Sequence, residues 1–123
     1  MASPHKPIHI LCLGNSLTEG YTCYGTQFHP YTTTLHHHLT TTLPNPITVL
    51  NDGLSGDEIL GPNMKPRLLH SLSAAKYSNI QFDWIIILAG RNDLPNPGNT
   101  VSDVYAGLKE LIKLGKSRQR VQE

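Results

Sequence analysis

The chain has 123 residues, a length that suits one domain with one hydrophobic core. Its formal net charge is +1 and only 15% of its residues are charged, so the charge balance gives no indication of a nucleic-acid partner or an acidic substrate. Basic residues gather near the C-terminus, where we expect a solvated helix face followed by a tail: Lys109, Lys113, Lys116, Arg118 and Arg120.

Neither the cysteines nor the apolar runs indicate a disulfide framework, a metal site or a membrane segment. Cys12 lies in an apolar run and is expected to pack as a small hydrophobic side chain, and its spacing from Cys23 fits no metal motif. The N-terminus lacks the long apolar stretch of a signal peptide, and the run Trp84–Ala89 is too short to span a bilayer. We therefore expect a cytoplasmic protein.

The first half of the chain predicts two strands and a helix. Residues 8–13 are β-rich and mostly apolar and end at Gly14, as a buried strand does. Pro30 suits the first position of a helix, and residues 47–50 form a second short apolar strand. The predicted apolar face of that helix recurs every four residues: Tyr31, Leu35, Leu39 and Leu43. Pro44 and Pro46 then end the helix.

The second half repeats the alternation of strands and helices. Asp57 could cap the next helix, whose expected buried face is Leu68, Leu69 and Leu72. Residues 84–88 are continuously apolar, which predicts a strand buried on both faces of a parallel sheet. The last helix is expected to end near Gly115 and to bury one stripe, made of Val101, Tyr105, Leu108, Leu111 and Ile112.

Strands and helices that alternate in this way predict a single α/β domain with a parallel sheet over residues 1–123, in which residues 116–123 form an unstructured tail. The carboxyl ends of parallel strands meet at one edge, where ligands bind in such folds. Small polar residues follow each predicted strand, so the three loops should converge: Gly14–Thr18, Gly53–Asp57 and Gly90–Asp93.

These loops contain the groups that acyl transfer requires. The hydroxyl of Ser16 could attack a substrate carbonyl, and the resulting oxyanion would need donors aimed at it. The backbone N–H groups of Ser16 and Gly56 and the side-chain amide of Asn92 could supply three. Glycine at position 56 permits close approach and an unusual backbone angle.

The motifs LCLGNSLTEG, NDGLSGDE and LAGRNDL, in this order, resemble the first three blocks of the SGNH (GDSL-type) hydrolases. The resemblance covers residues 8–114, the N-terminal part of such a domain, and FHPY and FDWIIILAGRNDL are also similar to intracellular-type members found in fungi. It implies a flavodoxin-like three-layer α/β/α sandwich that hydrolyses short acyl or acetyl esters without a metal or organic cofactor. It assigns Ser16 as nucleophile and first oxyanion donor, Gly56 as the second donor and Asn92 as the third.

The chain departs from this family pattern in two ways. Asn15 stands where the family usually has Asp, but Asn can make similar hydrogen bonds to nearby backbone. The family's general base is a His three residues after an Asp. None of the Asp residues of this chain has a His at that distance; they are Asp52, Asp57, Asp83, Asp93 and Asp103. A serine without a base is a weak nucleophile, so we expect little or no activity from the chain.

The family continues into a fourth and a fifth strand where this chain ends. We therefore expect a truncated gene model, an intron read-through or a deliberate fragment. With three strands, residues 84–88 would form an exposed, apolar sheet edge, which predicts marginal stability and poor solubility.

Simpler interpretations of the same residues stay open. Ser16 could be an ordinary helix N-cap, Gly56 a turn glycine and Asn92 a loop residue, and Asp93 is expected to be structural. His36, His37 and His38 are expected to be surface or half-buried helix residues and not a metal site. His29 and His70 are expected away from the predicted strand ends, with a small chance that one of these histidines replaces the base.

The rival functions are a non-catalytic pseudoenzyme or fragment that binds acyl or glycan ligands, and a flavodoxin-like module. The sequence GNSLTEG matches no phosphate-binding loop, which argues against a nucleotide or flavin. The expected partner is a small-molecule ester, with no nucleic acid or membrane, and the sequence leaves the oligomeric state open.

Overall fold

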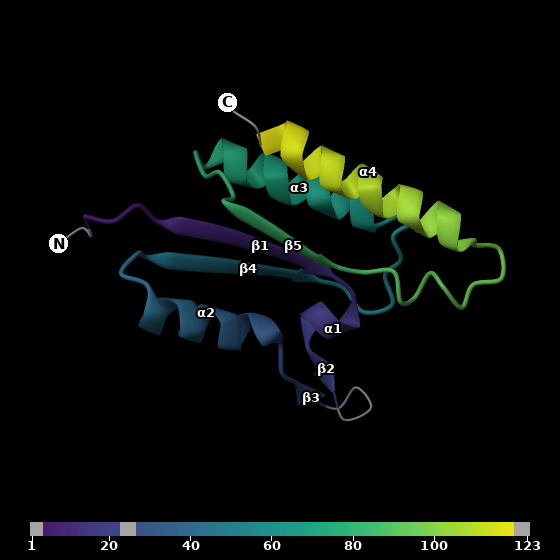
Figure 1. Cartoon of the computed structure of the whole chain (residues 1–123), viewed down its shortest axis with the longest axis horizontal. Coiled ribbons are helices and arrows are strands. Elements are labelled where there is room, and N and C mark those ends of the chain that lie inside the picture. The colour runs from purple at the N-terminus through teal and green to yellow at the C-terminus, as the bar shows by residue number, and fades with distance from the viewer. Residues whose placement is uncertain (1–3, 23–26, 120–123) are drawn as a thin grey trace.

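The computed structural model of the chain describes residues 4–22 and 27–119. Helices lie on both faces of a three-stranded parallel sheet (Figure 1), so the predicted α/β class is confirmed. The strand order is β4-β1-β5, with β1 at Ile8–Gly14, β4 at Ile47–Gly53 and β5 at Trp84–Leu88. One face carries α1 and α2, at Ser16–Glu19 and Tyr31–Thr42, and the other carries α3 and α4, at Met64–Tyr77 and Val101–Gln119.

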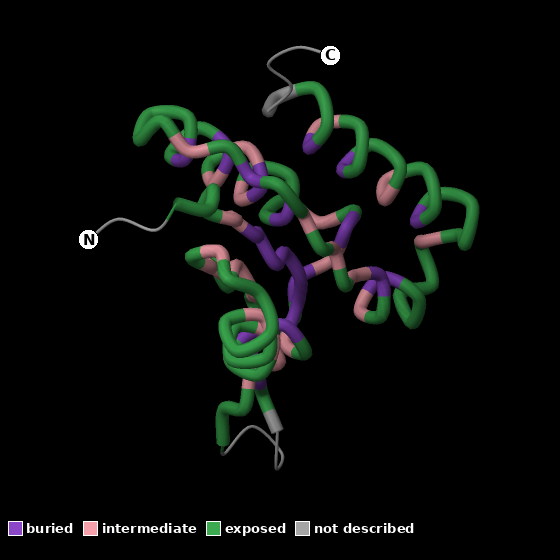
Figure 2. Tube along the Cα trace, turned by 60° about the vertical axis from the view of Figure 1, so that its left-hand side comes forward, coloured by how far each residue is buried: buried purple, intermediate pink, exposed green. Residues whose placement is uncertain are grey.

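The central strand β1 organises the core. It pairs in parallel with β4, Ile8 beside Ile47, and with β5, Leu11 beside Ile85. Leu11 and Leu13 are completely buried against α3 and α4, where burial of apolar surface supplies most of the stabilisation. Figure 2 shows that the longest buried stretch of the chain runs through the middle of the molecule.

Two helix starts differ from the sequence prediction. Pro30 is the extended N-cap of α2 and not its first helical residue, and only Thr32 of that helix is fully buried. Helix α3 begins at Met64 after Asn63, so Asp57 does not cap it. The Asp57 carboxylate instead pairs with Arg67 and accepts from Glu58 N in its own loop.

The predicted stripe of α4 was partly wrong. Val101, Tyr105 and Ile112 are 73%, 61% and 42% exposed, whereas the buried stripe contains Val104 and Leu111. Helical spacing alone could not locate this stripe, because apolar residues surround much of the helix and the contact with α3 and the sheet selects among them.

Helix α4 also continues past the predicted end. Gly115 is buried within the helix, and a Cβ there would lie 3.1 Å from Ile85 Cδ1. This glycine therefore permits close packing on β5 and does not terminate the helix. Residues 116–119 are helical, contrary to the predicted tail, while residues 120–123, with Arg120, lie outside the described part.

Strand β5 is not buried on both faces, as its apolar run had predicted. Trp84, Ile86 and Leu88 are 67%, 36% and 43% exposed, whereas Ile85 and Ile87 pack on the core. In the described chain β5 has a strand neighbour on one side only and helix cover on one face. The expectation of an exposed apolar edge strand is therefore confirmed.

A small hairpin was missed in the sequence. Strands β2 (Tyr21–Thr22) and β3 (Gln27–Phe28) pair antiparallel, and the rings of Tyr21 and Phe28 lie 4.3 Å apart. Cys23 and Gly25 fall outside the described residues. Among the helices that are described, none has the length and apolar character needed to cross a membrane.

Candidate active site

The three motif loops meet at the carboxyl ends of the strands, as predicted. Leu54 N donates to Gly14 O over 3.1 Å, which joins the loop after β4 to the loop after β1. Asn92 Nδ2 donates to Asp57 O over 3.0 Å, which joins the loop after β5 to the loop after β4. The loops that carry Ser16, Gly56 and Asn92 are therefore linked to one another by hydrogen bonds.

Ser16 is the half-buried first residue of α1, directly after β1. Asn15, only 1% exposed, is the N-cap, and its Oδ1 accepts from Leu17 N over 3.1 Å. The alternative of Ser16 as N-cap is therefore wrong, and the expected backbone hydrogen bond of Asn15 is confirmed. A Cβ at Gly14 would lie 2.6 Å from Leu88 O, so only glycine fits between the first and third loops.

Gly56 lies in the loop after β4 with φ at +78°, the left-handed region that favours glycine. The expected unusual backbone angle is thus confirmed. The residue is exposed, and no atom outside its immediate chain neighbours lies within 4 Å of the position that a Cβ would occupy. The space beside this turn is open.

Asn92 is half-buried in the loop after β5, and its amide is only partly used. Nδ2 carries two hydrogens, and the bond to Asp57 O uses one of them. The second hydrogen remains for another acceptor, as an oxyanion donor would require.

Asp93 has a structural role, as expected. It is completely buried, and its two carboxylate oxygens accept from Ile59 N and Leu60 N, each over 2.9 Å. Asn99 Nδ2 donates to its backbone oxygen over 2.9 Å. These bonds satisfy buried backbone donors that would otherwise be costly, so this carboxylate stabilises the loops.

Sequence reasoning missed two residues that connect the loops. Arg67 of α3 pairs with Asp52 and Asp57, and Glu19 Oε1 accepts from both N and Oγ of Ser55, each over 2.7 Å. Arg67 belongs to no motif, and its side chain reaches the loops only because the fold brings α3 beside them. Glu19 lies in the first motif, but no local pattern indicates that it binds Ser55.

The five histidines considered as metal ligands or as a replacement base are exposed. His36 Nε2 contacts Ile47 O at 3.1 Å, and His29 Nε2 contacts Gln27 Oε1 at 3.2 Å. His37, His38 and His70 are exposed helix residues. Within residues 4–22 and 27–119, no three His, Cys, Asp or Glu side chains are grouped so as to hold a metal ion.

A buried polar pair lies on the other face of β1. Cys12 is fully buried with a free thiol, and burial raises its pKa. Burial raises the pKa of Tyr31 to about 12, and the neighbouring Cys12 adds to the rise. At neutral pH both side chains are therefore uncharged, and neither can serve as a base.

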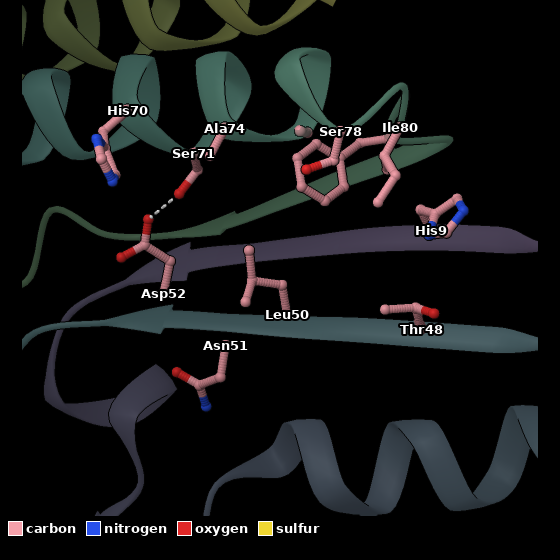
Figure 3. Close-up of a pocket in the computed structure, with 12 residues that line it drawn as sticks. His9, Thr48, Leu50, Asn51, Asp52, His70, Ser71, Ala74, Ser78 and Ile80 are labelled. Carbon is pink, nitrogen blue, oxygen red and sulfur yellow. Dashed lines mark hydrogen bonds between the residues drawn. The ribbon is translucent and has the colours of Figure 1, made fainter.

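A cavity of about 480 Å³ lies between α3 and the β4–β1 part of the sheet (Figure 3). Leu50, Ala74 and Phe82 give it apolar walls. At one end Ser71 Oγ donates to Asp52 Oδ2 over 2.7 Å. None of Ser16, Gly56 and Asn92 lines the cavity, so the cavity is separate from these three residues.

Residues 12–122 match the model of the GDSL-like lipase/acylhydrolase family, which is most of the chain. No curated protein matches the sequence.

Solved structures share the fold. The esterase AlinE4, an SGNH-hydrolase family member, is 22% identical with a TM-score of 0.72 over 91% of this chain and 55% of its own. A carbohydrate acetylesterase family member from Sinorhizobium meliloti is 22% identical with a TM-score of 0.69 over 94% and 57%. An aryl esterase of M. smegmatis is 24% identical with a TM-score of 0.63 over 86% and 53%.

The chain thus spans little more than half the length of these structural neighbours, with the same α/β arrangement. Together with the family match, this fold shows that the chain belongs to the GDSL-like lipase/acylhydrolase family.

Proposed function

We propose that the chain carries the nucleophile and oxyanion part of a serine carboxylic ester hydrolase. Ser16 acts as the nucleophile and first oxyanion donor through its backbone N–H, Gly56 donates through its backbone N–H, and Asn92 through its side-chain amide. The substrate class is a small-molecule ester of an acetyl or other short acyl group, and no metal or organic cofactor takes part.

The observation that supports this proposal is the linkage of the three motif loops. The bonds from Leu54 N to Gly14 O and from Asn92 Nδ2 to Asp57 O join loops that lie far apart in the sequence. Three donors preorganised around one serine are what a tetrahedral oxyanion requires. The names of the neighbouring esterases and of the acetylesterase family member agree with this class of chemistry.

In the proposed reaction, Ser16 Oγ bonds to the acyl carbon while the carbonyl electron pair moves to oxygen and the three donors bind that oxyanion. The serine proton passes to a base and then to the departing alcohol as the C–O bond breaks. Water then attacks the acyl-enzyme, releases the acid and restores the serine hydroxyl.

We further propose that the chain by itself is weakly active or inactive. No Asp in the sequence is followed by His at the third place, and in the described chain Ser16 Oγ makes no hydrogen bond to a histidine. On this view residues 1–123 correspond to the N-terminal part of an SGNH domain. The same observation favours a second candidate, a non-catalytic protein that binds acyl or glycan ligands.

Hydrolysis of p-nitrophenyl acetate by the purified chain tests the proposal. The comparison needs Ser16→Ala and the control Ser73→Ala, which changes an exposed serine on α3. Turnover above buffer that is lost in Ser16→Ala and kept in Ser73→Ala supports the hydrolase. Equal rates in all three proteins contradict a working hydrolase in this chain and favour the non-catalytic candidate.

A further inference from the structure

Arg67 extends from α3 toward the ends of two strands and contacts both. Its Nη2 donates to Gly14 O over 3.1 Å, just before the turn that holds Ser16. Its Nη1 donates to Asp52 O over 2.8 Å and to Asp52 Oδ1 over 2.7 Å, near the end of β4. One side chain therefore fixes the end of β4 relative to the end of β1.

The same guanidinium binds the carboxylate that follows the oxyanion glycine. Arg67 Nη2 and Nε donate to Asp57 Oδ2 over 2.5 and 3.1 Å. The Asp57 side chain is only 2% exposed and that of Arg67 19%, so water screens this pair weakly. Because Asp57 is covalently joined to Gly56, the ion pair also limits where the Gly56 N–H can lie.

The third loop is joined to this arrangement through Asp57. Its backbone oxygen accepts the amide hydrogen of Asn92, while its carboxylate is held by Arg67. Asp52 is fixed in turn, because Ser71 Oγ donates to the oxygen that Arg67 leaves free. All three loops are thus connected, directly or through one residue, to a side chain that lies outside every motif.

We propose that Arg67 is a positioning residue of the oxyanion site. It holds Asp57, and through it the Gly56 N–H and the Asn92 amide, in a fixed place relative to the Ser16 turn. This inference rests on the proposed function for its catalytic meaning, but the positioning itself is a property of the loops that can be measured without turnover.

The forked guanidinium is essential to this role. Its planar geometry lets it contact two carboxylates and two carbonyl oxygens at once, which a lysine ammonium at the end of a flexible stem cannot do. Arg67→Lys keeps the charge and loses the fork, and Arg67→Met loses both. Lys65→Met is the matched control, because Lys65 lies on the same helix in an exposed pair with Glu110.

Amide hydrogen exchange followed by NMR tests the positioning. The reporters are Asp57 N, which donates to Leu54 O, and Glu58 N, which donates to Asp57 Oδ1, with β1 amides as the reference. In Arg67→Met we expect exchange at both reporters to be faster by about tenfold, the effect of losing roughly one net hydrogen bond locally. Arg67→Lys should lie between, and Lys65→Met should match the unaltered chain.

Two results would overturn the inference. One is unchanged exchange at Asp57 and Glu58 in Arg67→Met. The other is a rise that is equally large in the β1 amides, because that would mean Arg67 stabilises the whole fold and not the loops.

Kinetics separate this inference from the proposed function. If turnover depends on Ser16, Arg67→Met should lower kcat by about a hundredfold with KM almost unchanged, because misplaced donors weaken transition-state binding. Local loosening without any Ser16-dependent turnover would support the positioning and would mean that this chain is not a working hydrolase by itself. Ser16-dependent turnover with the same kcat in Arg67→Met would contradict the positioning and support the hydrolase.

Discussion

The loops at the carboxyl ends of the strands and the β5 flank of the sheet are built in opposite ways. In the loops, polar groups are buried and paired: Asp93 accepts from two backbone donors, and Asp57 is bound by Arg67. On the flank, apolar side chains are exposed, with Trp84 at 67% and Leu88 at 43%. The carboxylates of Asp57 and Asp93 in the loops are paired within the described residues, whereas the flank leaves apolar surface in water.

The loops and the β5 flank therefore depend on different parts of the structure. The geometry of the proposed oxyanion donors depends on bonds among β1, β4, α3 and their loops, all of which are present. Among the described residues, no strand or helix covers the outer side of β5. A loop framework can therefore be well defined beside an edge that is prone to association.

Replacement of the buried loop carboxylate should have the largest effect on stability. Asp93→Ala leaves Ile59 N and Leu60 N without their acceptor, and unsatisfied buried donors cost about 2–4 kcal/mol together. Urea unfolding followed by circular dichroism measures the loss. The control Asp103→Ala, at an exposed position in the first turn of α4, should cost less than about 1 kcal/mol. Equal losses in both variants would remove the distinction between paired loop groups and surface groups.

A side chain at the Gly56 turn should cost somewhat less. Gly56→Ala places a Cβ on a backbone with φ at +78°, which strains an L-residue by about 1–2 kcal/mol. No clash contributes, because the space around that Cβ is open. The matched control is Gly98→Ala. A Cβ there would lie 3.5 Å from Asn96 Oδ1, an ordinary contact, and the φ of Gly98 is not in the left-handed region. A Gly56→Ala protein as stable as Gly98→Ala would show that this turn adopts another backbone conformation.

Alkaline titration should distinguish a tightly packed interior from the open flank. The folded-state pKa of Tyr31, about 12, exceeds its ordinary value of 10.0. Its contribution to stability is therefore fully present below about pH 10 and is lost as the pH rises toward 12. Tyrosinate absorbance should show a late-titrating phase, and Tyr31→Phe should remove it. A late phase that persists in Tyr31→Phe would place the shifted tyrosine elsewhere.

A charge on the exposed face of β5 should change folding stability least. Trp84→Lys alters a largely exposed side chain, so we expect the free energy of unfolding to shift by no more than about 0.5 kcal/mol. Self-association should nevertheless decrease, because a lysine blocks edge pairing of apolar strands. Sedimentation velocity over a range of concentrations measures this. The same association in Trp84→Lys and in the unaltered chain would mean that the flank is not the surface that associates.

Much of the framework followed from the sequence, and the reasons for the misses are physical. The apolar runs located β1, β4 and β5, and the glycine-containing loops after them identified the edge of the sheet where the three motif loops are linked by hydrogen bonds. The orientation of α4 was missed, because contacts with α3 and β5 choose which of its apolar residues are buried. Arg67 was missed, because its partners lie 10 to 53 positions away in the chain and only the fold brings them together.

Hydrogen exchange of the unaltered chain tests the contrast between the two regions most directly. The Ile59 and Leu60 amides, which donate to Asp93, should exchange as slowly as the β1 amides. Within β5, which has one strand neighbour in the described chain, every second amide lacks a strand partner, so slow and fast exchange should alternate from Trp84 to Leu88. Fast exchange at Ile59 and Leu60, or uniform protection along β5, would contradict the account of a self-contained loop edge beside an open flank.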